Sequence, residues 1–219
     1  MENINQESNQ ITETSNFSEE VKRFYKGKFK EIISTFFKNP KEGLREIFEN
    51  ASGEGYKNSL ILYGAVFILY VVGMYLVLGN MTRHMNFGDF IKMGLIPVVM
   101  MLSISVVSFG VKSIFGKSNF KSELLTGGIC GIPMTLFLVG LFILKIFGDS
   151  NALSLMYSPT SGGFIGSLFF IYILVMLINV LQQSLLAAKT KETFAWYISP
   201  AAILLAGFIA FKVMDGIFS

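Results

Sequence analysis

Three polar side chains share one face of the apolar stretch between residues 164 and 187. Asn179, Gln182 and Gln183 follow three-and-four spacing, which places them together on a helix. Such amides could bind a transported substrate. The default interpretation is that they bond to neighbouring helices, a contact worth about 1 kcal/mol each in lipid. These three residues form the candidate intramembrane polar site, and both interpretations stay open.

Other residue types that carry chemistry are scarce. His84 is the only histidine and Cys130 the only cysteine. A two-histidine metal site, a thiolate cluster and an intrachain disulfide are therefore excluded within this chain. His84 and Asp89 could at most supply one pair of metal ligands in a short outer loop, and a solvated loop position is the simpler interpretation of His84. We assign no catalytic, metal-binding or cofactor-binding residue and expect no cofactor.

Known catalytic motifs are also missing. The sequence contains no nucleophile elbow, Walker loop or complete dinucleotide fingerprint. A lipid-modifying enzyme would need an acid/base pair, and none is evident. We therefore expect a protein that is not an enzyme.

A basic segment precedes the apolar part of the chain. Its large apolar residues recur at helical spacing, which predicts an amphipathic helix: Val21, Phe24, Tyr25, Phe29, Ile32, Ile33, Phe36 and Phe37. Cations occupy the rest and are the candidate membrane-surface residues: Lys22, Arg23, Lys26, Lys28 and Lys30. Such a helix could lie on anionic lipid or dock on the protein's own helices. Its aromatics are in helical register rather than on a stacking sheet, so we expect no nucleic-acid partner.

A second short helix is expected after this segment. Asn39 could cap it, Pro40 could take its first position and Glu42 could close a capping box. Leu44, Ile47 and Phe48 give this helix an apolar side. Residues 52–55 are expected to form a flexible joint after it.

Composition places the remainder in a bilayer. The 219 residues are 52% hydrophobic and 15% charged, which is too apolar for a soluble domain of this size. Five uncharged stretches are long enough to cross a hydrocarbon layer of about 30 Å: residues 59–79, 93–111, 124–144, 164–187 and 193–211. The segment from Ser158 to Gly163 is predicted to be a loop. The fold class is therefore all-α, a bundle of five transmembrane helices preceded by cytoplasmic amphipathic helices.

Three regions follow from this pattern. Residues 1–18 form a disordered polar tail, residues 19–58 a cytoplasmic amphipathic helical segment, and residues 59–219 the transmembrane domain. With the N terminus in the cytoplasm, fourteen of the 18 Lys and Arg residues lie inside. A multi-pass protein of the cell membrane with its C terminus outside is predicted.

Glycines and prolines interrupt the spans. The stretches Thr126–Gly131 and Ser161–Gly166 each contain Gly four residues apart. They could be half-sites of an inverted repeat, but close helix packing is the preferred interpretation. Three prolines could break helices around a transport site or simply bend them: Pro97, Pro133 and Pro200. Three serines could bond to their own helix backbone: Ser103, Ser105 and Ser108.

The order of these features resembles the Yip (Ypt-interacting protein) domain family, and the Lys, Asn and Ile bias resembles that of a bacterial member. The resemblance covers residues 29–214. Three short motifs carry it: residues 36–40, which end in Asn39 and Pro40; residues 120–125, followed by Gly131–Pro133; and Trp196–Tyr197. It implies contacts with other membrane proteins. It supplies no catalytic residue.

Two functions follow as hypotheses. The first is a non-enzymatic membrane protein that binds protein partners or organises lipid. Its partners would be the bilayer and other membrane proteins or a second copy of itself. The alternative is a small transporter or lipid translocase with a site between the helices.

Overall fold

The computed structural model describes residues 19, 21–50, 55–115, 119–147 and 161–218. These residues form helices and connecting turns, with no strand among them. Within the described part of the chain, five helices are long and apolar enough to cross a membrane. They are α4 (Gly55–Leu78), α5 (Phe87–Ser113), α6 (Phe120–Phe147), α8 (Ser161–Ala187) and α9 (Glu192–Phe218).

The prediction of five long apolar helices is thereby confirmed. Four of the predicted spans lie wholly within one of these helices, and the first ends one residue beyond α4. That residue, Gly79, begins the short 3₁₀ helix η1 (Gly79–His84), which connects α4 to α5.

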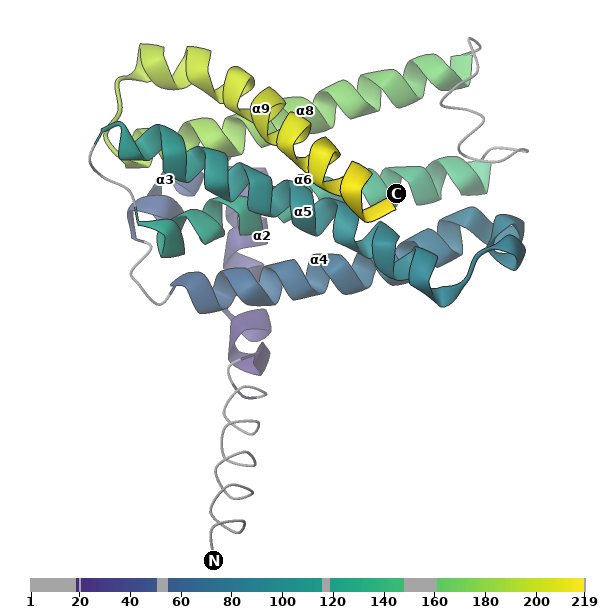
Figure 1. Cartoon of the computed structure of the whole chain (residues 1–219). Coiled ribbons are helices and arrows are strands. Elements are labelled where there is room, and N and C mark those ends of the chain that lie inside the picture. The colour runs from purple at the N-terminus through teal and green to yellow at the C-terminus, as the bar shows by residue number, and fades with distance from the viewer. Residues whose placement is uncertain (1–18, 20, 51–54, 116–118, 148–160, 219) are drawn as a thin grey trace, which may run out of the picture.

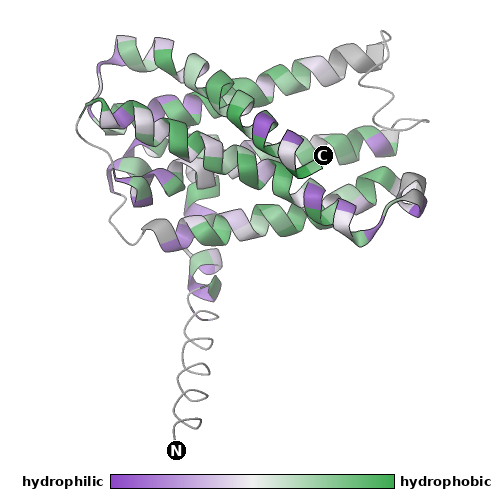
Figure 2. Ribbon diagram, in the orientation of Figure 1, coloured by the Kyte–Doolittle hydropathy of each residue, from purple (hydrophilic) through white to green (hydrophobic). Residues whose placement is uncertain are grey.

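The five long helices are apolar on both their inner and outer sides. In each of the five helices, less than half of the most apolar 18-residue stretch is buried inside the bundle. Large apolar side chains such as Leu60, Ile68 and Phe208 are exposed on the outside, which would be costly in a soluble protein. Figure 2 shows hydrophobic residues along the helices and hydrophilic ones mainly near their ends. This pattern is that of a bundle with lipid as its outer solvent.

The bundle packs around α5 and α6. Helix α4 packs on both of them, α9 packs on α5 and α8, and α8 packs on α6. Met101, Ile104, Ile129 and Val180 are completely buried in this core. One end of the bundle, where α4, α6 and α9 begin and α5 and α8 end, also carries α3 (Glu42–Glu49), and we call it the α3 end.

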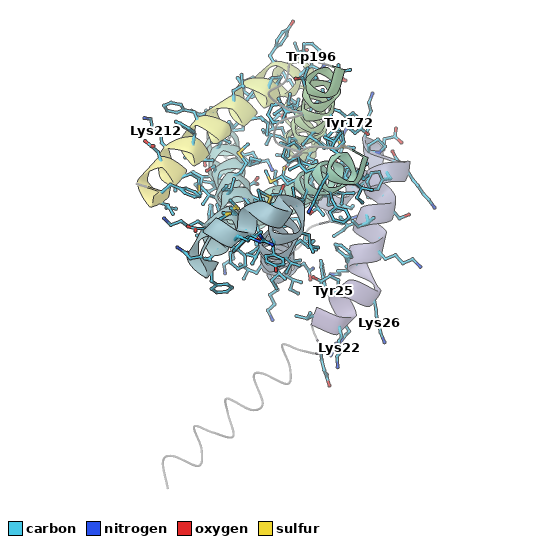
Figure 3. All side chains as sticks on the ribbon, turned by 90° about the vertical axis from the view of Figure 1, so that its right-hand side faces the viewer. Lys22, Tyr25, Lys26, Tyr172, Trp196 and Lys212 are labelled. Carbon is cyan, nitrogen blue, oxygen red and sulfur yellow. The ribbon has the colours of Figure 1, made fainter. Side chains whose placement is uncertain are left out.

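The N-terminal helices lie outside the bundle. Residues 21–26 are helical, Gly27 forms a turn, and α2 (Lys28–Lys38) follows. Figures 1 and 3 show α2 running across the long helices rather than along them. Phe24, Ile32 and Phe36 are buried against the core. Helix α3 packs on α8 through a side that includes the fully buried Leu44.

Two local predictions are wrong, and the first concerns the start of α3. Asn39 does not cap this helix: it follows the last residue of α2, and its backbone N–H donates to the carbonyl of Thr35. Helix α3 begins at Glu42, and Lys41 precedes it without a side-chain cap. Because Asn39 completes the last turn of α2, the Asn39–Pro40 pair forms the corner between the two helices.

The second correction concerns the predicted loop before the fourth span. Helix α8 begins at Ser161, so Gly162 and Gly163 are helical. Glycine weakens a helix but does not forbid it when the following apolar run is long. Residues 158–160, the polar tail at 1–18 and most of the predicted joint at 52–55 lie outside the described residues.

Candidate functional site

A buried ion pair lies at the α3 end of the bundle. Lys112 Nζ on α5 donates to both carboxylate oxygens of Glu123 on α6, each at 2.9 Å. The side chains are only 7% and 2% exposed. Burying two charges is expensive unless every polar atom has a partner, so the surrounding hydroxyl groups decide whether the arrangement is stable.

Hydroxyl groups provide further hydrogen bonds to the ion pair. Ser108 Oγ donates to Glu123 at 2.6 Å, and Thr126 Oγ1 donates to the same oxygen at 3.3 Å. Lys112 also donates to Ser184 Oγ on α8 at 2.8 Å, and Ser184 lies 2.6 Å from Thr126 Oγ1. Every fully buried side-chain nitrogen and oxygen in the described residues has a partner. The hydroxyl groups and the ion pair together join α5, α6 and α8.

A second chain of hydrogen bonds extends this arrangement to α4. Tyr63 Oη lies 2.9 Å from Ser105 Oγ, and Ser105 donates to the backbone carbonyl of Glu123 at 2.9 Å. Ser105 and Ser108 therefore do not use the possible bonds to their own helix, because both hydroxyl groups donate to Glu123 on α6. We call these residues the buried polar cluster: Tyr63, Ser105, Ser108, Lys112, Glu123, Thr126 and Ser184.

In the sequence, Lys112 and Glu123 are the charged residues next to the predicted spans 93–111 and 124–144, and neither is a candidate site residue. The spacing of the polar residues could have indicated this site. Ser105, Ser108 and Lys112 share one face of α5, and Glu123 and Thr126 share one face of α6. The Glu123 carboxylate already accepts hydrogen bonds from the Lys112 ammonium and three hydroxyl groups. We interpret the buried polar cluster as a clamp between helices.

The candidate intramembrane polar site is used in part for internal bonding. Asn179 Nδ2 donates to the carbonyl of Pro40 at 2.9 Å, and Gln183 Nε2 donates to Asn179 Oδ1 at 3.3 Å. Gln183 is buried, whereas Gln182 is half-buried. The structure therefore joins Asn179 and Gln183 and uses them to hold the corner between α2 and α3 against α8.

Glycines in α6 allow close helix contacts. A Cβ atom on Gly127 would overlap the side-chain oxygen of Tyr63 and the backbone carbonyl of Met101. A Cβ on Gly131 would lie 2.8 Å from Val66 and 3.0 Å from Met101. The packing interpretation therefore holds for these two glycines.

The three prolines of the spans lie inside continuous helices. Pro97 belongs to α5, Pro133 to α6 and Pro200 to α9. A transport site of the broken-helix type needs half-helices whose ends face the substrate. The prolines do not divide their spans in that way, so the described helices offer no such ends at these positions.

The residues considered as metal ligands, His84 and Asp89, belong to the opposite end of the bundle. Asp89 forms a capping box with Asn86, with its carboxylate 2.9 Å from the Asn86 backbone N–H. The backbone of His84 ends η1. No group of three potential metal-ligating side chains occurs among the residues that the structure describes.

The basic candidates remain accessible. Lys22, Arg23, Lys26, Lys28 and Lys30 are all exposed, and Figure 3 shows Lys22 and Lys26 extending away from the bundle. Arg23 has an exposed ion pair with Glu19 at 3.6 Å. The two alternatives for this segment are thus compatible, because its apolar side docks on the core while its cations face outward.

Two hollows flank α2. A groove of about 130 Å³ lies between α2, α4 and α6 and is lined almost wholly by apolar side chains, including Phe29. A polar cleft of about 230 Å³ lies on the other flank, among α2, α3 and the beginnings of α4 and α6. The groove reaches Leu69 and Leu136, whereas the cleft reaches only Asn58 and Leu125. The cleft therefore lies nearer the α3 end.

Comparison with known proteins adds no relative: no family model, curated protein or solved structure matches this chain.

Proposed function

We propose that this chain is a non-enzymatic multi-pass membrane protein of Yip-domain type that organises anionic lipid through its N-terminal helices. The observation that carries the proposal is the two-sided N-terminal segment. Phe24, Ile32 and Phe36 fix it to the bundle, while the neighbouring cations stay exposed. A fixed row of cations beside a transmembrane bundle attracts the headgroups of anionic lipids.

The position of α2 supports this proposal. Helix α8 has 27 residues and is about 40 Å long, about the thickness of a bilayer with its headgroup layers. Asn179, which bonds to the α2–α3 corner, lies about 12 Å from the end of α8. Because each headgroup layer is about 5–7 Å thick, this position lies about 5–7 Å inside the hydrocarbon layer, within the depth to which interfacial helices bury their apolar side.

The two flanks of α2 agree with this depth. The apolar groove faces the middle of the bundle, and the polar cleft faces its α3 end. A helix at the edge of the hydrocarbon layer needs this arrangement, since one flank meets acyl chains and the other meets headgroups and water. We place this side of the membrane in the cytoplasm because most Lys and Arg residues lie at the α3 end.

The transport hypothesis receives less support. Asn179 and Gln183, which motivated it, bond to the α2–α3 corner and to each other. The described pockets beside α2 do not include them. We therefore keep lipid organisation as the proposed function.

The proposal is tested with a peptide of residues 19–38 and with the full chain. Circular dichroism should show the peptide becoming helical on vesicles of phosphatidylglycerol and less so on phosphatidylcholine. Each cation near an anionic surface contributes about 1 kcal/mol. Replacing Lys22, Arg23 and Lys26 by Gln should therefore weaken peptide binding by about 100-fold at low salt.

The full chain provides the second measurement. In mixed-lipid nanodiscs, the same triple variant should retain less phosphatidylglycerol than the unchanged protein. A control that replaces Lys92 and Lys212 by Gln changes cations outside this segment and should leave retention unchanged. Equal peptide helicity on both vesicle types, together with equal lipid retention, would refute the proposal.

A further inference from the structure

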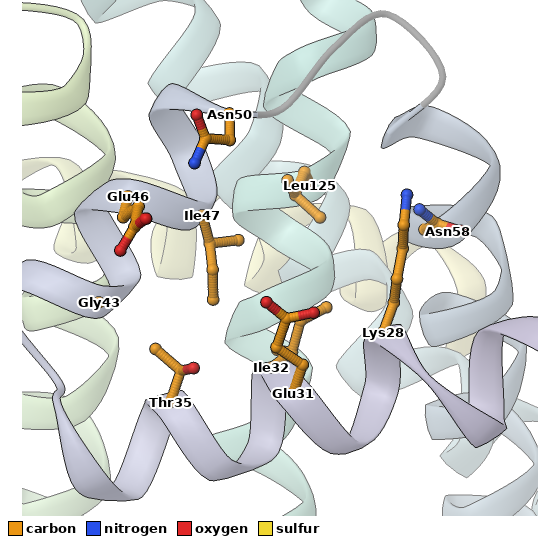
Figure 4. A pocket seen from close by; sticks show the side chains of 10 residues that line it. All are labelled: Lys28, Glu31, Ile32, Thr35, Gly43, Glu46, Ile47, Asn50, Asn58 and Leu125. Atoms are coloured by element: carbon orange, nitrogen blue, oxygen red, sulfur yellow. The ribbon is translucent and has the colours of Figure 1, made fainter.

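The polar cleft beside α2 brings together three charged side chains from two helices. Lys28 and Glu31 come from α2, and Glu46 comes from α3. Figure 4 shows the carboxylates of Glu31 and Glu46 pointing into the same space, with the Lys28 ammonium at its far side near Asn58. The cleft therefore has an acidic side and a basic side.

The two glutamates of the cleft form no ion pair within the described residues. The ion pairs there join other residues. Lys28, Glu31 and Glu46 are all exposed. With two carboxylates and one ammonium, the cleft carries a net charge of −1 and complements a ligand that has both a cation and an anion.

The floor of the cleft is apolar. Ile32 and Leu125 are buried there, and Ile47 is half-buried. Asn58 and Leu125 lie about 5 and 8 Å from the beginnings of α4 and α6. Under the proposed function this is the headgroup layer, so a ligand with a polar head and an apolar body is available at the right depth.

We propose that this cleft binds the headgroup of an aminophospholipid of the phosphatidylethanolamine type, an inference that rests on the proposed lipid-organising function. Glu31 and Glu46 accept hydrogen bonds from the primary ammonium, and Lys28 pairs with the phosphate. The glycerol region lies against the apolar floor. The proposal adds a specific zwitterionic ligand to the general attraction for anionic lipid.

The side chains of the cleft discriminate against two other cations. A divalent metal ion takes six or more oxygen ligands and usually several carboxylates, and among the described residues no three Asp, Glu, His or Cys side chains are placed to hold a metal ion. A choline headgroup has no N–H donor and is recognised by aromatic cages. The described residues that line the cleft include no aromatic side chain.

The test uses the full chain in nanodiscs that contain phosphatidylethanolamine, phosphatidylcholine and phosphatidylglycerol in equal amounts. Lipids retained on the protein are measured by native mass spectrometry. We expect about tenfold enrichment of phosphatidylethanolamine over phosphatidylcholine, since one charge-assisted contact of about 1.4 kcal/mol corresponds to that ratio. In the double variant Glu31→Gln and Glu46→Gln, the ratio should fall to about one.

A matched control removes two other carboxylates from the same region. Glu42 and Glu49 are exposed residues of α3 that do not line the cleft, and Glu49 makes an exposed ion pair with Arg45. Glu42→Gln with Glu49→Gln should keep the enrichment. Loss of enrichment in this control, or its survival in the Glu31/Glu46 variant, would overturn the proposal.

The same spectra separate this inference from the proposed function. The ratio of phosphatidylglycerol to phosphatidylcholine reports on the basic segment, while the ratio of phosphatidylethanolamine to phosphatidylcholine reports on the cleft. Soluble glycerophosphoethanolamine at millimolar concentration should fail to displace the lipid. Displacement would assign the cleft to a soluble ligand and overturn the lipid assignment.

Discussion

Lys112 Nζ lies 2.9 Å from both carboxylate oxygens of Glu123, although the two residues belong to different helices. The pair is buried and also bonds to hydroxyl groups of Ser108 and Ser184. Removing one partner of such a pair leaves an uncompensated charge, whereas removing both does not. The pair should therefore be a strong determinant of stability.

Lys112→Met alone, or Glu123→Leu alone, should destabilise the protein by about 3–5 kcal/mol. The double variant should recover a large part of this loss, because no charge remains buried without a partner. Cys130 is the only cysteine and is fully buried, so a thiol-reactive dye reports thermal unfolding in detergent. A double variant that equals the sum of its single variants would contradict this interpretation.

Gly127→Ala should destabilise the bundle. The added Cβ would overlap the carbonyl of Met101, which is backbone and cannot rotate away, and overpacking of this kind costs about 1–3 kcal/mol. Gly64→Ala and Gly110→Ala are matched controls, since nothing lies within 4 Å of the added atom. They should be neutral or stabilising by up to about 1 kcal/mol. Equal unfolding temperatures for all three variants would argue against close packing at Gly127.

Asn179→Leu should loosen α3 without unfolding the bundle. It removes the hydrogen bond to the carbonyl of Pro40, which is worth about 1 kcal/mol. Amide hydrogen exchange in α3 should therefore rise about fivefold. Gln182→Leu, one turn along the same helix, serves as the control and should leave exchange in α3 unchanged. The same result for both variants would show that the Asn179 contact does not hold the corner.

The C terminus should lie outside the cell. Alkaline phosphatase fused after Ser219 should be active, and green fluorescent protein fused there should stay dark. Fusions that end after Lys191, between α8 and α9, should give the reverse result, because the cations at the α3 end stay in the cytoplasm. A fluorescent protein fused after Ser219 that lights up would reverse the orientation on which the lipid proposal depends.

The sequence by itself determined that this is a membrane protein with five long apolar helices. An apolar run long enough to cross lipid must form a helix there, since every backbone polar group needs an internal partner. This constraint is local, and residues such as Lys92, Lys145 and Lys212 mark the limits of the runs. It does not depend on which helices become neighbours.

Only the tertiary structure decided how the polar side chains are used. Lys112 and Glu123 looked like ordinary boundary residues until the packing of α5 against α6 brought them together and α8 added Ser184. Likewise, Asn179 meets Pro40 across 139 positions of the chain, and the cleft needs residues from α2, α3, α4 and α6. Periodicity gives the face on which a side chain lies, but helix packing chooses the partner of that face.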